Sequence, residues 1–203
     1  MISFTCWKEQ IPGAGEDAFP CVTEDSETVF LGVWDGLGGA GSRKIHWNGD
    51  LVSEARVAAE IASAFFGLFS PTELQKMPVA SIVSELQTKL RSVLLNASGI
   101  KSKLLKRLPT TFAGIWLSKH YTDWQEATIR WAGDSRVYSL HPRFGLRQLT
   151  VDDVNPLQDA FSLLYSDGLI TNCLSADHPF LLHETLLTKN DLIYPLFAIS
   201  GGV

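Results

Sequence analysis

The chain of 203 residues is long enough for one substantial hydrophobic core, whereas two domains of this total length would each be thin. Its hydrophobic fraction of 45% and charged fraction of 19% exclude a disordered composition, so one globular domain over residues 1–203 is predicted. The net charge of −5, without a basic stripe, argues against a nucleic-acid partner.

The remaining compositional signals concern cysteine, histidine and the membrane. Three cysteines without CxxC spacing predict neither a disulfide framework nor a thiolate metal site. No apolar window reaches transmembrane length and the N-terminus lacks the pattern of a signal peptide, which predicts no membrane partner and a cytoplasmic location. The five histidines lack metal-ligand spacing and are predicted as surface or loop residues: His46, His120, His141, His178 and His183.

The first predicted elements along the chain are strands. Residues 2–7 alternate between apolar and polar side chains, as in a strand with one buried face. Residues 18–22 and the nearly continuous apolar run 29–34 predict two more strands, the second covered on both faces. This second strand ends abruptly in a glycine-rich loop.

Two helices are predicted next. Apolar positions recur at helical spacing over residues 50–66, with Asn48 or Asp50 available to cap the first turn. A Ser-Pro turn separates this segment from a second apolar stripe over residues 79–94, which stops near Gly99. The two helices are expected to be antiparallel neighbours.

After Pro109 the pattern changes to short strands separated by turns. These strands are predicted to form a β-meander over residues 110–117, 128–132, 136–140 and 146–149. Beyond Asp152 the pattern weakens until a last apolar strand at 192–199. Strands, a helical pair and further strands indicate an α+β layered domain in which helices cover antiparallel sheets.

Asp35 and Gly36 are the first candidates for chemistry. Asp35 follows the buried strand and precedes glycines, so the backbone can bend sharply there and leave carbonyl oxygens accessible. Magnesium and manganese prefer carboxylate, carbonyl and water oxygens, and Asp35 with the Gly36 carbonyl could supply the first two. An ordinary Asp-Gly turn between strands fits the local pattern equally well.

Two other acidic segments could join this site. Glu16-Asp17 lies across a hairpin-like pair of strands from Asp35, and Asp134 lies in the segment Gly133-Asp134-Ser135-Arg136 between two strands. Carboxylates brought to ~4 Å would repel by roughly 4 kcal/mol per pair near a protein surface, unless a cation is bound between them. Taken alone, the segment around Asp134 also fits a plain turn.

In chain order the sequence resembles the metal-dependent protein phosphatase family, type 2C, over roughly residues 2–153. The resemblance is carried by Glu16-Asp17-Ala18, Val33-Trp34-Asp35-Gly36-Leu37-Gly38-Gly39, Pro109-Thr110-Thr111-Phe112-Ala113-Gly114, Ala132-Gly133-Asp134-Ser135-Arg136-Val137-Tyr138 and Gln148-Leu149-Thr150-Val151-Asp152-Asp153. It implies a four-layer αββα sandwich of two antiparallel sheets flanked by helices, with two Mg²⁺ or Mn²⁺ ions between the sheets. In the family, a metal-activated water attacks phosphoserine or phosphothreonine in protein substrates.

The resemblance also implies a role for each candidate residue. Asp35 would be the central catalytic residue and bridge the two metals, and Gly36 would offer its carbonyl to one of them. Glu16 and Asp17 match the family's acidic pair, one as a ligand and the other holding metal-bound water. Asp134 matches an aspartate that helps to hold a third, weaker metal in some members.

The sequence departs from the family pattern near the start of the site. Leu37 replaces a histidine that many members carry and cannot donate a proton, although bacterial members often lack this histidine too. The phosphate-binding arginine before the acidic pair is missing. Lys8 is the nearest cation and a weak phosphate-binding candidate, with an exposed strand-end lysine as the alternative.

The late metal-binding aspartate of the family poses a larger question. Asp167 in Ser166-Asp167-Gly168 resembles the motif locally, whereas the strand ending at Ser200 is better placed but carries Gly201 where the aspartate belongs. The later strand is favoured. On this interpretation the chain is an incomplete phosphatase domain at its C-terminal end, and a catalytically impaired phosphatase-like pseudoenzyme or binding module is the alternative to an active enzyme.

Overall fold

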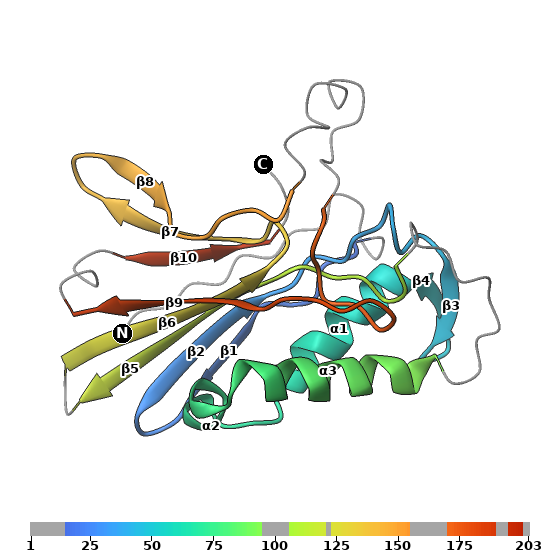
Figure 1. The fold of residues 1–203 in the computed structure, drawn as a ribbon, viewed down its shortest axis with the longest axis horizontal. Coiled ribbons are helices and arrows are strands. Elements are labelled where there is room, and N and C mark those ends of the chain that lie inside the picture. The colour runs from blue at the N-terminus through green and yellow to red at the C-terminus, as the bar shows by residue number, and fades with distance from the viewer. Residues whose placement is uncertain (1–14, 95–105, 121–122, 155–169, 190–194, 201–203) are drawn as a thin grey trace.

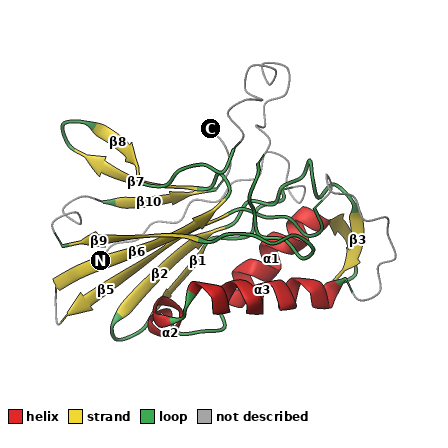
Figure 2. Cartoon of the chain, in the orientation of Figure 1, coloured by secondary structure: helices red, strands yellow, loops and turns green. Residues whose placement is uncertain are grey.

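A computed structural model describes residues 15–94, 106–120, 123–154, 170–189 and 195–200. In these ranges the chain forms a five-stranded sheet, a three-stranded sheet, a two-stranded hairpin and three helices (Figures 1 and 2). The strand predicted at residues 2–7 lies outside the described residues.

The five-stranded sheet is antiparallel throughout and has the order β1-β2-β5-β6-β9. Its strands are β1 (Cys21–Glu24), β2 (Thr28–Val33), β5 (Phe112–His120), β6 (Asp123–Ala132) and β9 (His183–Thr188). The four strands predicted between residues 18 and 132 are confirmed within a few residues. β9 was not predicted, because its six residues are half-buried in alternation and carry no continuous apolar run.

The three-stranded sheet has the order β10-β7-β8 and is also antiparallel, with β7 (Arg136–His141), β8 (Gly145–Gln148) and β10 (Leu196–Ile199). The predicted β-meander is therefore wrong, since β6 and β7 follow one another in the chain but belong to different sheets. The chain changes sheet at Gly133, whose φ of 90° lies in the left-handed region that favours glycine. The connection that carries Asp134 is thus a crossing between sheets.

A short hairpin precedes the first helix and corrects the predicted helix start. β3 (Lys44–Trp47) and β4 (Asp50–Ser53) pair across Asn48 and Gly49, which have φ values of 51° and 94°. An Asn-Gly pair with positive φ at both positions is typical of a tight two-residue hairpin turn. Residues 50–53 are therefore strand, and α1 (Glu54–Phe66) starts later than predicted, capped by the Ser53 hydroxyl.

The other two helices are α2 (Pro71–Lys76) and α3 (Val79–Val93). The Ser-Pro pair that was expected to form a turn begins α2, because Ser70 and Glu73 make a reciprocal capping box. α3 matches the predicted apolar stripe and buries Ile82, Leu86 and Leu90. None of the described helices is long and apolar enough to cross a membrane.

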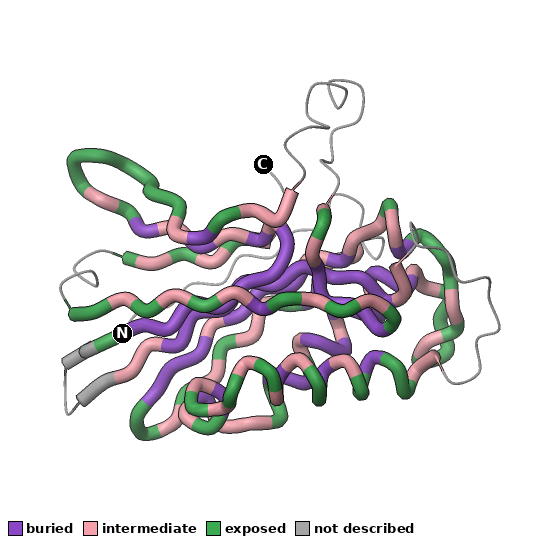
Figure 3. The backbone as a smooth tube through the Cα atoms, viewed as in Figure 1, coloured by how far each residue is buried: buried purple, intermediate pink, exposed green. Residues whose placement is uncertain are grey.

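Two apolar cores cover the two faces of the five-stranded sheet. One contains aromatic side chains of β2 and β5 packed beneath α1 and α3, and the other lies between the five-stranded and three-stranded sheets. Because both faces are covered, the middle strands of the five-stranded sheet are largely buried (Figure 3). The α+β class with two antiparallel sheets is confirmed, and the described helices lie on the side of the five-stranded sheet away from β7, β8 and β10 (Figure 1).

Two facing glycines make room for the aromatic core. Gly32 and Gly114 are register partners, and a Cβ on Gly114 would lie 2.5 Å from Cζ of Phe112 and 3.0 Å from Cζ3 of Trp116. Both aromatic side chains are fully buried. The rings of Phe112 and Trp116 therefore occupy the space that any larger residue at position 114 would need.

Gly114→Ala is expected to lower the free energy of unfolding by about 1–3 kcal/mol, because the core is overpacked. The midpoint of urea unfolding measures the loss. Gly67→Ala is the control, since the nearest atom to an added Cβ there is 3.5 Å away and the glycine has φ of −73°. Equal midpoints for the two variants would contradict this account of the core.

Candidate metal centre

Asp35 lies two residues beyond the end of β2, and the two residues just before β5 hold its backbone. Its carbonyl accepts hydrogen bonds from the Thr111 amide at 2.8 Å and the Thr110 hydroxyl at 2.8 Å. Gly36 forms an isolated β-bridge with Thr110. The segment Thr110-Thr111 therefore holds the strand end that presents the Asp35 carboxylate.

The glycine-rich loop after Asp35 packs against the N-terminus of α1. The Gly41 amide donates to the Leu37 carbonyl at 2.7 Å, and the Ala55 amide donates to the Gly41 carbonyl at 3.2 Å. A Cβ on Gly36 would lie 2.5 Å from the Glu16 carbonyl oxygen and 2.7 Å from the backbone of Ala55. Only glycine fits at position 36, which places the backbone of Glu16 close to the loop.

Glu16 and Asp17 reach the same place from the start of the described chain. The Ala18 amide donates to the Trp34 carbonyl at 3.1 Å, which aligns the acidic pair with the end of β2. The side chain of Glu16 lies over Gly38, where an added Cβ would collide with its Oε2. The predicted acidic pair and the glycine-rich loop are therefore in contact.

Asp134 approaches from the crossing between the two sheets. Gly133 packs on Thr111, since an added Cβ would lie 2.6 Å from Thr111 Cγ2. The buried hydroxyl of Ser135 shares a hydrogen bond of 2.5 Å with the Thr111 hydroxyl. Thr111 thus connects the backbone of Asp35 to the turn that carries Asp134.

The electrostatics show that these acids lie close together. The pKa of Asp35 is raised to about 8, first by burial, then by a hydrogen bond with the Asp17 side chain and by the negative charges of Asp17, Asp134 and Glu16. The structure therefore brings together Glu16, Asp17, Asp35 and Asp134, with Gly36 beside them.

The donor set fits a hard divalent cation, because it consists of oxygen atoms alone. Within the described part of the chain, however, no three Asp, Glu, His or Cys side chains lie close enough together to coordinate one metal ion as they stand. With a pKa of about 8, the Asp35 carboxyl is protonated near neutral pH. A cation at this position would have to displace that proton.

The end of β10 also reaches the acidic group. The Ser200 hydroxyl donates to Oδ2 of Asp17 at 3.2 Å, although these residues are 183 positions apart. The strand ending at Ser200 was favoured over the segment around Asp167 as the late strand of the site, and this contact agrees with that prediction, although the hydrogen bond itself was not predicted. Lys8, Asp167 and Gly201 lie outside the described residues, so their predicted roles stay predictions.

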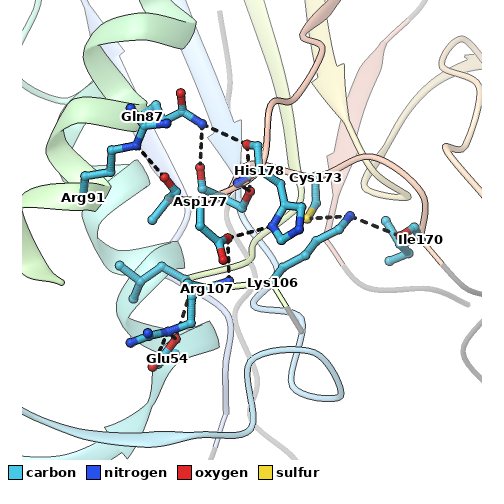
Figure 4. A network of polar contacts seen from close by, with 12 residues as sticks. Glu54, Gln87, Arg91, Lys106, Arg107, Ile170, Cys173, Asp177 and His178 are labelled. Atoms are coloured by element: carbon cyan, nitrogen blue, oxygen red, sulfur yellow. Dashed lines mark hydrogen bonds and ion pairs between the residues drawn. The ribbon is translucent and has the colours of Figure 1, made fainter. Parts of the chain in front are cut away.

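A polar network anchors the segment before Thr110 (Figure 4). The carboxylate of Glu54 in α1, 1% exposed, accepts from Nε of Arg107 at 2.8 and 3.0 Å and from the Leu108 amide at 3.3 Å. The Arg107 amide in turn donates to Asp177 at 2.9 Å. Arg107 is the last residue of the basic stretch 101–107, and it pairs with a buried carboxylate.

The described structure also holds a cavity of about 560 Å³, lined by both polar and apolar side chains, but it lies at the opposite end of β2 from Asp35 and contains none of the predicted site residues. Gln75 of α2 spans it, accepting from the Ser118 hydroxyl at 2.7 Å and donating to the Thr128 hydroxyl at 3.1 Å. These groups satisfy one another. We therefore place the chemistry at the acidic group and treat the cavity as part of the attachment of α2.

Gly38 allows a selective test of the acidic group. Gly38→Ala is expected to displace the flexible Glu16 side chain while the fold persists, and to lower Mn²⁺ affinity roughly 10- to 100-fold, as for other lost supporting contacts at metal sites. Isothermal titration calorimetry measures the affinity. Gly39→Ala is the matched control, because an added Cβ there meets nothing within 4 Å. Equal affinities in the two variants would exclude a role for Glu16.

No protein-family model matches the sequence, and no curated protein matches it. Solved structures of phosphatases do match. A bacterial serine phosphatase aligns with a TM-score of 0.59 at 16% identity, over 92% of this chain and 72% of that one. Serine/threonine phosphatase Stp1 from Staphylococcus aureus aligns with a TM-score of 0.56 at 14% identity, over 92% of this chain and 69% of that one. The Mycobacterium tuberculosis serine/threonine phosphatase PstP/Ppp aligns with a TM-score of 0.51 at 18% identity, over 88% of this chain and 68% of that one. The shared feature is the fold, that of the PPM-type phosphatases.

Proposed function

We propose that this chain is a divalent-cation-dependent phosphatase that hydrolyses phosphoserine and phosphothreonine in protein substrates. The observation that carries the proposal is Asp35, whose pKa is raised to about 8 by burial and by three neighbouring acids at a glycine-rich strand end. Such a group of like charges favours a bound cation. The likeness in fold to bacterial serine/threonine phosphatases supports the same class of reaction.

The residues that would hold Mn²⁺ or Mg²⁺ are the ones that lie near this strand end: Glu16, Asp17, Asp35, Asp134 and the carbonyl of Gly36. When bound, the cation supplies an acidic water and neutralises charge on the phosphoryl oxygens. The chain itself keeps the carboxylates in place, because Thr110 and Thr111 hold the Asp35 backbone. The Asp35 carboxyl, with its pKa of about 8, would give up its proton when the cation binds.

Turnover in the presence of manganese tests the proposal. The purified chain is expected to hydrolyse a chromogenic phosphate ester and a phosphoserine peptide only with added Mn²⁺. Asp35→Asn is expected to lower the rate by at least about 100-fold, as for the loss of a group that acts in the transition state. A wild-type rate with Mn²⁺ no higher than that of Asp35→Asn would exclude the proposed activity.

A binding module without turnover is the second candidate. It is favoured by Leu37, which cannot donate a proton to the leaving group, and by the lack of three converged ligands among the described residues. Such a module would bind a phosphoserine peptide in the presence of Mn²⁺ without releasing phosphate. Mn²⁺-dependent release that Asp35→Asn abolishes would exclude it. A cytoplasmic location remains a prediction from the sequence.

A further inference from the structure

The carboxylate of Asp153 is bound on several sides although it lies outside the acidic group. Its Oδ2 accepts from the Gly133 amide at 2.9 Å and from Nδ2 of Asn172 at 2.6 Å. Its Oδ1 lies 2.9 Å from Nε2 of His183. The side chain is 16% exposed, so these three groups replace most of its contact with water.

Asp153 makes a second, reciprocal contact with the same turn. Its own amide donates to the Gly133 carbonyl at 3.0 Å, so that Asp153 binds both backbone groups of Gly133. Gly133 is the residue directly before Asp134, and its φ of 90° together with its contact to Thr111 leaves it little freedom. The direction in which the chain leaves Gly133, and hence the position of Asp134, depends on these two hydrogen bonds.

His183 holds Asp153 from the neighbouring strand. Its ring stacks on Trp131, with centroids 5.1 Å apart and planes at 24°, and the two residues are register partners of β9 and β6. The indole Nε1 of Trp131 donates to the Val151 carbonyl at 2.9 Å, two residues before Asp153. His183 was predicted as a surface or loop residue, but it is part of a strand and packs against an aromatic ring.

We propose that Asp153, held by His183 and Asn172, is a positioning residue for Asp134 that sets the affinity of the acidic group for divalent cations. The inference rests on the proposed function only in taking that group as a cation site. Groups that orient metal ligands through hydrogen bonds, without binding the metal themselves, typically contribute 10- to 100-fold to metal affinity. Asp153 acts in this way on the backbone before Asp134 and touches neither cation nor substrate.

Two substitutions of Asp153 distinguish the effect of its hydrogen bonds on the position of Asp134 from the effect of its negative charge. Asp153→Ala removes every side-chain contact and is expected to weaken Mn²⁺ binding roughly 10- to 100-fold. Asp153→Asn keeps an oxygen for the Gly133 amide and can turn its NH₂ group toward His183, which accepts in its other tautomer. It is expected to keep most of the affinity despite the lost charge.

Asp25→Ala is the matched control, since Asp25 is also a carboxylate that accepts from backbone amides at a turn between strands. Its oxygens bind the amides of Glu27, Thr28 and Thr72, at the opposite end of β2 from Asp35. This variant is expected to lower the melting temperature but to bind Mn²⁺ as the wild type does.

Isothermal titration of the full chain with MnCl₂, for the wild type and the three variants, gives the decisive affinities. Wild-type affinity in Asp153→Ala, equal weakening in Asp153→Asn, or equal weakening in Asp25→Ala would each overturn the inference. So would a wild type that binds no Mn²⁺. A wild type that binds Mn²⁺ without hydrolysing phosphate esters would exclude the proposed activity, while the ranking of the variants still decides the role of Asp153.

Discussion

Asp35→Asn is expected to stabilise the metal-free protein at pH 8 by about 2–4 kcal/mol and to abolish its stabilisation by Mn²⁺. In the folded chain the pKa of Asp35 is about 8, against an ordinary value of 3.8. Between these values the folded state binds more protons than the unfolded state, so the free energy of unfolding falls as pH rises from about 4 to about 8. Asparagine carries no charge and removes this loss.

Urea unfolding at pH 5 and pH 8 measures the effect. The wild type is expected to lose stability between the two pH values, whereas Asp35→Asn loses much less. With Mn²⁺ at pH 8 the order reverses, because only the wild type gains a ligand that binds the folded state. Asp50→Asn, an exposed acid in β4, serves as the control. A wild type and an Asp35→Asn variant with the same pH dependence would contradict the role assigned to Asp35.

Glu54→Ala is expected to lower the free energy of unfolding by about 3–5 kcal/mol, the usual cost of removing one partner of a buried ion pair. The Glu54 carboxylate is 1% exposed and binds Nε of Arg107 at 2.8 Å, with Nε of Arg43 at 3.7 Å. The variant leaves the Arg107 guanidinium beside a cavity without its counter-charge. The midpoint of urea unfolding reports the loss.

A double variant and a control variant show whether the loss in Glu54→Ala comes from the unpaired charge of Arg107. Glu54→Met combined with Arg107→Met is expected to recover most of the stability, since the unpaired charge is then absent. Glu27→Ala breaks the exposed pair with Lys76, whose atoms are 3.6 Å apart, and is expected to cost less than about 1 kcal/mol. A loss from Glu54→Ala no larger than that from Glu27→Ala would show that burial does not strengthen the Glu54 pair.

The sequence predicted one half of the candidate site because its signals are local. A continuous apolar run ending in Asp35 and several glycines specifies a buried strand followed by a sharp bend, and the structure confirms both. Local signals failed where the same apolar residues fit both the spacing of a helix and the alternation of a strand. Leu51 and Val52 fit the helical spacing of the following segment, yet the Asn-Gly turn before them makes them strand. The crossing at Gly133 was missed for a related reason. The local sequence of a turn is the same whether it joins two strands of one sheet or strands of two different sheets.

The contacts that support the site could not be predicted from spacing. His183 and Asp153 are 30 positions apart, and Arg107 and Glu54 are 53 apart. Each pair forms only because separate elements meet in the folded chain. A buried glutamate at the first turn of α1 and a histidine within a strand carry no local pattern that distinguishes them from exposed residues.

Calorimetric titration with MnCl₂ at pH 7, repeated in two buffers of different ionisation enthalpy, tests most directly whether the acidic group around Asp35 is a cation site. The Asp35 carboxyl, with its pKa of about 8, carries a proton at this pH. Mn²⁺ is therefore expected to bind the wild type with release of a proton to the buffer, and to bind Asp35→Asn at least about 100-fold more weakly. Absence of binding by the wild type, or equal binding by the two proteins, would contradict the assignment.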